Sequence, residues 1–188
     1  MSTPSVFPAL AQCLWPETAN PAPAIWALLD GARDPGIFPA VRDSGLDHSC
    51  LFAGELSPQW QAVAPYLVQL SPRKPATALL LEQAWGNSWG VLMRVPNPLR
   101  LRLHLKTFLR AQLPDGKRVM FRYYDPRVLR GYLPLCNSNE LRTLLGPIEH
   151  FLMESDGGDE LIEFGQHEGQ LTQRHYTVRE ATTLVATD

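Results

Sequence analysis

The chain has little cysteine, no long apolar run and no surplus of either charge. Its three cysteines, Cys13, Cys50 and Cys136, lie far apart and form no Cys-x-x-Cys pair. This spacing argues against a disulfide framework and is typical of reduced thiols. No apolar stretch reaches the roughly 20 residues of a bilayer span, and no basic segment followed by an apolar run opens the chain. We therefore expect a cytoplasmic, unprocessed protein that needs no metal or other cofactor.

The balance of charge limits the choice of partners. The sequence holds 17 Lys and Arg against 19 Asp and Glu, for a formal net charge of -2. Sequence-independent binding of nucleic acid depends on clustered, surplus Lys and Arg. We therefore expect neither a nucleic acid nor a membrane as partner, although a local basic patch is compatible with this balance.

Proline is abundant, and its distribution divides the chain. The prolines near the start predict a loosely structured lead-in over residues 1–22, with at most a short helix at 9–14. A single α/β domain over residues 23–155 follows, because a chain of this length supports one good core. Residues 156–188 form a polar C-terminal extension, in which a hairpin around residues 165–169 is expected.

Short apolar runs between turn residues predict strands that alternate with helices. Runs such as "AIWALLDGA" are continuously apolar, as expected of strands buried on both faces. The pattern favours an α/β layer fold with a mixed, mostly parallel central sheet of about five strands, flanked by helices and followed by a small C-terminal helical or hairpin extension. The predicted strands cover residues 24–32, 49–56, 65–70, 89–95 and 118–125, and the predicted helices cover 35–43, 76–86, 97–113, 126–133 and 137–146.

Polar residues directly before prolines predict helix starts at Asp34-Pro35, Asn97-Pro98 and Asp125-Pro126. Asp and Asn are favoured N-caps, and proline is favoured at the first helical position. This pattern assigns structural roles to Asp34, Asp125 and Pro126. Asn137 and Glu140 have the spacing of a capping box, which predicts a further helix start at Asn137.

The stretch "FRYYDPRVL" places three charges in an apolar, aromatic run. Alternation along a strand directs Arg122 and Tyr124 to one face and Asp125 to the other. Asp125 is then a helix cap, or it lies at a strand end beside Asp30, as in the clefts of open α/β sheets. In the second reading Arg122 and Arg127 bind an acidic group of a partner or ligand.

A basic stripe is predicted on the helix over residues 97–113. Arg102, Lys106 and Arg110 follow one another at i, i+4 spacing. Such a stripe is either a solvated face or the complement of an acidic segment on a partner.

Signals of catalysis are weak. His48 and Cys50 lack an orienting third group, "GNSWG" lacks the G-x-S-x-G spacing, and no Walker A sequence occurs. We therefore expect a protein that is not an enzyme. The alternative is a small-ligand or nucleotide-binding enzyme that uses Asp30 and Asp125 with Arg122 and Arg127.

Aromatic side chains offer anchors for a protein partner, since interface hot spots are often Trp, Tyr or Arg. We expect three of the five tryptophans in the core instead. The candidate anchors are Trp15, Trp26, Trp60, Trp85, Trp89, Tyr123, Tyr124 and Tyr132.

Several blocks, in order, resemble the domain-of-unknown-function 4123 (DUF4123) family. They are "WALLDGARDPGIF", "LFAGEL", "APYLVQL", "WGNSWGVLMR", "LRLHLKTFLRAQLPDGKRVMFRYYDPRVLRGYLP" and "LLGPIEHFLMES", between about Ile25 and Ser155. The resemblance implies a cytoplasmic adaptor or chaperone of a Gram-negative bacterium. Such a protein binds a toxic effector of the type VI secretion system and promotes its loading onto the VgrG spike.

The family implies no catalytic residues and no cofactor. The residues that we predict to bind a partner are Arg102, Lys106, Arg110, Arg122, Tyr124, Asp125 and Arg127. The residues that we predict to be structural are Asp30, Asp34, Asp125 and Pro126.

Overall fold

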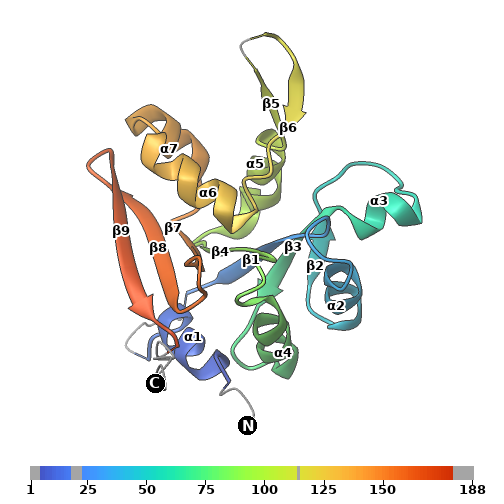
Figure 1. Ribbon diagram of the computed structural model, residues 1–188, viewed down its shortest axis with the longest axis vertical. Helices are drawn as coiled ribbons and strands as arrows, with labels where there is room; N and C mark the ends of the chain where they lie inside the picture. The colour runs from blue at the N-terminus through green and yellow to red at the C-terminus, as the bar shows by residue number, and fades with distance from the viewer. Residues whose placement is uncertain (1–4, 18–22, 114, 180–188) are drawn as a thin grey trace, which may run out of the picture.

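One seven-stranded sheet forms the centre of the protein (Figure 1). The computed structural model describes residues 5–17, 23–113 and 115–179. The strand order is β2-β3-β1-β4-β7-β8-β9, and every neighbouring pair is antiparallel. The strands are β1 (Ile25–Asp30), β2 (His48–Cys50), β3 (Pro65–Leu70), β4 (Gly90–Arg94), β7 (His150–Glu154), β8 (Glu160–His167) and β9 (Gln170–Thr177).

Helices cover both faces of this sheet, and a small second sheet projects from it as a hairpin (Figure 1). The hairpin consists of β5 (Arg110–Gln112) and β6 (Arg118–Met120). The helices are α1 (Phe7–Leu14), α2 (Ile37–Asp43), α3 (Pro58–Ala62), α4 (Pro75–Ala84), η1 (Pro98–Arg100), α5 (Leu101–Thr107), α6 (Pro126–Tyr132), η2 (Leu133–Leu135) and α7 (Ser138–Leu145).

The core has two parts, one on each face of the sheet. On one face, Ala27 and Leu29 of β1 share an apolar cluster with buried residues of α1, α2 and α4. On the other face, Leu28 shares a cluster with buried residues of α5, α6 and α7. Successive side chains of a strand point to opposite faces, so β1 must be apolar throughout. This explains the continuous apolar run at residues 24–32.

The predicted fold class is wrong in both the direction and the number of strands. We expected a mostly parallel sheet of about five strands, and the structure has a seven-stranded antiparallel sheet together with the two-stranded hairpin. A continuous apolar run indicates that both faces of a strand are buried, but it does not indicate whether neighbouring strands are parallel or antiparallel. Here helices cover both faces of an antiparallel sheet, so the usual association of such runs with parallel strands fails.

The segment around residues 97–125 also differs from its prediction. The predicted helix over residues 97–113 ends at Thr107, and the predicted strand over 118–125 ends at Met120. Within α5, Leu101 and Leu105 are buried at i, i+4 spacing, while Leu103 is 67% exposed. The chain then forms the β5–β6 hairpin before it reaches α6.

The predicted strand over residues 49–56 is wrong for most of its length, because β2 ends at Cys50 and residues 51–57 form a loop. Several other predicted elements are present at nearly their expected bounds. β3 covers residues 65–70, and the β8–β9 hairpin turns between His167 and Gln170. Both strands of that hairpin continue the main sheet. Helix α1 begins at Phe7 and buries Leu10 and Leu14, so the start of the chain contributes to the core. Residues 1–4 and 18–22 of the predicted lead-in lie outside the described residues.

Helix caps follow the sequence in three of four cases. Asn97 caps η1, where its Oδ1 accepts a hydrogen bond from the backbone N–H of Leu99 at 3.1 Å. Asn137 and Glu140 form the expected capping box of α7, and Asp125 caps α6. Asp34 instead accepts a hydrogen bond from the backbone N–H of Gly36 at 2.7 Å, and α2 begins only at Ile37. A helix start at Pro35 is therefore wrong, and Asp34 stabilises the turn before the helix.

Candidate functional site

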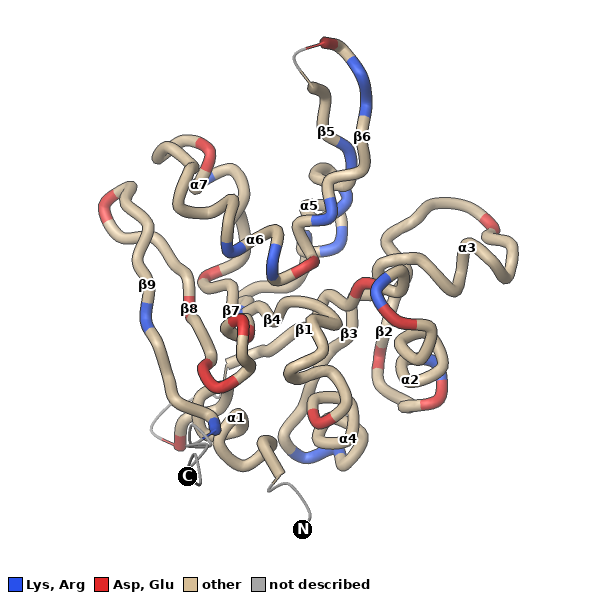
Figure 2. Tube along the Cα trace, in the orientation of Figure 1, with Lys and Arg blue, Asp and Glu red and all other residues tan. Residues whose placement is uncertain are grey.

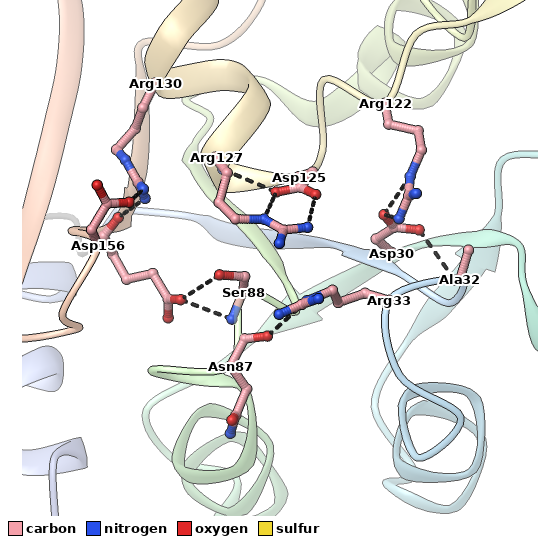
Figure 3. Close-up of polar contacts among 11 residues, drawn as sticks. Asp30, Ala32, Arg33, Asn87, Ser88, Arg122, Asp125, Arg127, Arg130 and Asp156 are labelled. Carbon is pink, nitrogen blue, oxygen red and sulfur yellow. Dashed lines mark hydrogen bonds and ion pairs between the residues drawn. The ribbon is translucent and has the colours of Figure 1, made fainter.

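The two carboxylates singled out in the sequence lie in one polar cluster where several loops meet (Figure 3). Asp30 is the last residue of β1 and is fully buried. Its Oδ2 accepts a hydrogen bond from Nε of Arg122 at 2.9 Å, and Nη2 of Arg122 donates to the same oxygen. Its Oδ1 accepts from the backbone N–H of Ala32 at 3.1 Å. Asp30 therefore ties the end of β1 to the loop before α6.

Asp125 starts α6 and is also buried. Its Oδ1 accepts from the backbone N–H of Arg127 at 3.0 Å and from Nε of Arg127 at 2.9 Å. Its Oδ2 accepts from Nη2 of Arg127 at 2.6 Å. The predicted cap is confirmed. Arg122 binds Asp30. Residues 121–125 form a loop, so the strand alternation that we used to predict the directions of Arg122 and Asp125 does not apply there.

The two carboxylates respond differently to their surroundings. Burial raises the pKa of Asp30 above its ordinary 3.8, and the hydrogen bonds from Arg122 and Ala32 only partly offset this effect. Burial also raises the pKa of Asp125, but the side-chain and backbone hydrogen bonds from Arg127 outweigh it and hold that pKa below 3.8. Asp125 is therefore the more firmly ionised of the two.

A third carboxylate, Glu154 at the end of β7, lies nearby, because Arg130 of α6 donates to its backbone oxygen. It was not singled out in the sequence. It is buried and accepts hydrogen bonds from the backbone N–H of Gly86, from the N–H of Ser88 at 2.8 Å and from Oγ of Ser88 at 3.1 Å. Ser88 has a φ of +54°, which is unfavourable for a residue with a Cβ. The sequence signal that could have indicated Glu154 is its position as an acidic residue at the end of the apolar run "FLME".

Two further arginines join these loops, as Figure 3 shows. Arg130 of α6 donates to the backbone oxygen of Glu154 and to the side chain of Asp156. Arg33 donates from Nε to the backbone oxygen of Asn87 at 3.2 Å. The name "arginine cluster" is used below for Arg33, Arg122, Arg127 and Arg130 with the groups that they bind. Its members connect the ends of β1, β4 and β7 to α6.

The carboxylates of the arginine cluster are engaged within the chain. Each buried carboxylate, Asp30, Asp125 and Glu154, already accepts two or more hydrogen bonds. The side chains of Arg122 and Arg127 remain 40% and 48% exposed. The arrangement therefore suits the positioning of loops better than proton transfer, which needs a carboxyl within reach of a reacting group.

The His48–Cys50 pair shows no sign of activation. Nδ1 of His48 lies 2.9 Å from the backbone oxygen of Leu46, and burial raises the pKa of the Cys50 thiol. A nucleophilic thiol needs a lowered pKa instead. Among residues 5–17, 23–113 and 115–179, no group of three His, Cys, Asp or Glu side chains is placed to hold a metal ion.

The predicted basic stripe is divided between two elements. Arg102 and Lys106 lie on α5, but Arg110 lies on β5 because the helix ends at Thr107. Arg102 donates from Nη2 to the backbone oxygen of Cys50 at 3.0 Å. Lys106 and Arg110 nevertheless meet at one groove, so the structure brings two of the three residues together.

This groove, called the hairpin groove below, lies between the β5–β6 hairpin and the segment that leads into α3. Its volume is about 570 Å³. Trp60 is 59% exposed and Met120 is 46% exposed, which is unusual for large apolar side chains. The lining residues are Leu51, Phe52, Ala53, Leu56, Trp60, Lys106, Thr107, Leu109, Arg110 and Met120.

Most of the candidate aromatic anchors lie inside the protein. Tyr123 and Tyr124 are buried, so Tyr124 is a core residue and is not available to a partner. Trp85 and Trp89 are buried as well. Trp15 and Trp26 are partly buried, whereas Trp60 and Tyr132 are exposed. Nor does any helix in the described ranges have the length and apolar character needed to cross a bilayer.

These features define an α+β protein built on an antiparallel sheet, with an arginine cluster at its loops and an apolar groove beside a basic hairpin. The chain belongs to the DUF4123 family: the model described as "Domain of unknown function (DUF4123)" matches residues 25–143, well over half of the chain. The predicted family is thus confirmed. The matched range includes Asp30, Asp125 and the hairpin groove. No curated protein and no solved structure matches the chain.

Proposed function

We propose that this chain is a non-enzymatic adaptor or chaperone that binds an effector of the type VI secretion system in the cytoplasm and promotes its loading onto the VgrG spike. The observation that carries the proposal is its membership of the DUF4123 family over residues 25–143. All but the last of the blocks that resemble the family lie within this range, and the last covers residues 144–155. The proposed partners are therefore the effector and the VgrG protein.

The side-chain chemistry supports a binding role over a catalytic one. The buried carboxylates are engaged by arginines and backbone N–H groups, and burial raises the pKa of Cys50 and Cys13. A surface for a partner is available at the hairpin groove, where apolar side chains are exposed beside basic ones. Such exposed apolar patches are typical of interaction sites.

The experiment is co-expression of the tagged chain with the products of the adjacent genes, followed by pull-down and size-exclusion chromatography with light scattering. We expect a complex of fixed stoichiometry with an effector, a VgrG protein or both. An effector from an unrelated locus is the matched control. Absence of a complex with every neighbouring product, with all proteins soluble and at full length, would contradict the proposal.

The alternative is a small-ligand or nucleotide-binding enzyme at the arginine cluster. One observation favours it: the side chains of Arg122, beside Asp30, and Arg127, beside Asp125, are 40% and 48% exposed and can meet an anion. A ligand that binds only the native state raises the melting temperature. The alternative predicts that nucleotides or phosphorylated metabolites raise the melting temperature, and that the rise is smaller in Arg127→Ala. If no ligand in a broad panel raised the melting temperature, the enzyme alternative would be excluded.

A further inference from the structure

Charge is distributed very unevenly along the chain. The segment from Pro98 to Met120 holds six of the 17 Lys and Arg residues but only one of the 19 Asp and Glu residues. This segment forms η1, α5, β5 and β6, and Figure 2 shows its basic positions along α5 and the projecting hairpin. A chain with a net charge of -2 therefore presents one strongly basic surface. The six residues are Arg100, Arg102, Lys106, Arg110, Lys117 and Arg118.

These six side chains differ from most of the other basic residues between residues 23 and 155, which form ion pairs. Arg94, Arg122, Arg127 and Arg130 each form an ion pair with an Asp or Glu. Within the described part of the chain, none of the six forms such a pair. Their positive charge is thus not needed to neutralise a carboxylate of the same molecule.

The hairpin groove places this charge next to exposed apolar surface. Leu51 and Leu109 are buried at its floor, and Trp60 and Met120 stand exposed on its opposite sides. The rings of Phe52 and Trp60 lie edge to face at 6.4 Å. This contact fixes one wall of the groove but leaves more than half of Trp60 in solvent.

The three residues of the predicted stripe have different roles at this groove. Arg102 is engaged by the backbone oxygen of Cys50 and holds α5 against the end of β2. Lys106 and Arg110 line the groove itself. Lys106 and Arg110 are therefore the residues that can receive a carboxylate, and Arg102 positions the wall beside them.

We propose that the hairpin groove is the docking site for a segment of the partner protein that presents apolar side chains next to Asp or Glu residues. The inference rests on the adaptor function proposed above and names the part of the partner that is held. Apolar side chains of the segment fill the floor between Trp60 and Met120, as anchors fill the centre of other interfaces. Its carboxylates lie against Lys106 and Arg110, which gives charge complementarity.

The shape of the groove favours protein over nucleic acid. Single-stranded nucleic acid binds through several aromatic platforms along a basic track. Here one exposed aromatic side chain, Trp60, stands over a floor of leucines that offers no hydrogen bonds to bases. Binding of nucleic acid is therefore an outcome that would contradict the proposal.

The first test uses the full-length chain and the neighbouring gene product that it binds. Trp60→Ala removes the apolar wall, and the double variant Lys106→Glu/Arg110→Glu reverses the charge of the rim. The matched controls, Leu79→Ala and Arg73→Glu, change an exposed leucine on α4 and an exposed arginine before it, both away from the groove. Melting temperatures confirm that each variant is folded.

We expect at least tenfold weaker binding for each groove variant and unchanged binding for the controls. A wild-type complex that tolerates both groove variants would overturn the docking site and leave the adaptor function intact. Loss with Trp60→Ala but not with the charge reversal would overturn the acidic character of the segment. Loss of the complex on nuclease treatment would overturn protein recognition, and absence of any wild-type complex would overturn the adaptor function and this inference together.

A second measurement identifies the segment directly. Ala53 is exposed and lines the groove, so a photo-crosslinking residue, p-benzoylphenylalanine, is introduced there and the crosslinked peptide is read by mass spectrometry. We expect one segment of the partner, with apolar residues beside at least two Asp or Glu. The same crosslinker at Leu79 is the control. Crosslinks to a basic segment, or equal crosslinking from both positions, would contradict the proposal.

Discussion

Nε of Arg122 lies 2.9 Å from Oδ2 of Asp30, a fully buried carboxylate 92 positions away in the sequence. This pair joins the end of the central strand β1 to the loop before α6. Asp125, three residues after Arg122, then caps α6 and binds Arg127. Two neighbouring acid–arginine pairs therefore fix the same loop from two sides, and they are best separated by measurements of stability.

Arg122→Ala should destabilise the protein by about 3 kcal/mol, the lower end of the range for a broken buried pair, because Arg122 is itself partly exposed. The cost arises from leaving Asp30 buried and charged. The double variant Arg122→Ala/Asp30→Asn should therefore recover at least about 1 kcal/mol. Urea denaturation of the four proteins of this cycle measures both values. A double variant less stable than Arg122→Ala would contradict the role of the buried charge.

The pH dependence of stability should differ in sign between the two carboxylates. The pKa of Asp30 is raised above 3.8 by burial, so its contribution is fully present below pH 3.8 and is lost as pH rises through the folded-state pKa. The advantage of wild type over Asp30→Asn should therefore grow as the pH falls toward 3.8. Urea unfolding at a series of pH values gives this difference, and an advantage that shrinks on acidification would contradict it.

The opposite holds for Asp125, whose pKa lies below 3.8 because the hydrogen bonds from Arg127 outweigh the effect of burial. Its contribution is present above pH 3.8 and is lost as pH falls through the folded-state pKa. The advantage of wild type over Asp125→Asn should therefore be constant near neutral pH and decline below pH 3.8. Urea unfolding at the same series of pH values checks this prediction. If the stability differences of Asp30→Asn and Asp125→Asn from wild type changed with pH in the same direction, the two carboxylates would not have opposite pKa shifts.

Gly31 and Gly131 should respond oppositely to alanine. A Cβ at Gly31 would lie 2.5 Å from the backbone oxygen of Ala64, so Gly31→Ala must displace the turn that follows Asp30. We expect a loss of about 2 kcal/mol or more. Gly131 lies in α6 with open space around its Cβ position, and Gly131→Ala should stabilise by about 0.5–1 kcal/mol. Thermal unfolding measures both, and an equal effect would exclude the close approach at Gly31.

Glu154→Ala should destabilise the protein by about 2 kcal/mol, because the backbone N–H groups of Gly86 and Ser88 lose their acceptor. The positive φ of Ser88 is then also less well supported. Glu149→Ala, a change at a half-exposed carboxylate directly before β7, is the control and should have little effect. Denaturant unfolding compares the two. Equal losses would show that the contacts of Glu154 are dispensable.

The local elements of this protein are readable from its sequence because their causes are local. Asp125 before Pro126 predicts the start of α6, and Asn137 with Glu140 predicts the capping box of α7. The run at 65–70 predicts β3 at its observed bounds. In contrast, α3 and β7 were not expected, since five residues around Trp60 and the run "HFLME" carry weak signals of their own.

The candidate site was predicted in part. Asp30, Asp125, Arg122 and Arg127 were selected as charges near strand ends and do lie together, but the pairing of Arg122 with Asp30 depends on a loop that the sequence suggested was a strand. Glu154 was identified as a member of the site only from its hydrogen bonds in the tertiary structure. The hairpin groove exists because α5 ends at Thr107, before the predicted end of the helix at residue 113, and the chain then forms the β5–β6 hairpin.

The sequence by itself determined the family, the two-sided burial of β1 and the caps of α6 and α7, since motifs, periodicity and capping each depend on residues close in the chain. Only the tertiary structure decided the antiparallel order of the strands, the partner of each arginine and the meeting of Lys106 with Trp60 at one groove. These relationships join residues that are distant in sequence, and side-chain periodicity carries information about which face is buried, not about which segment covers it.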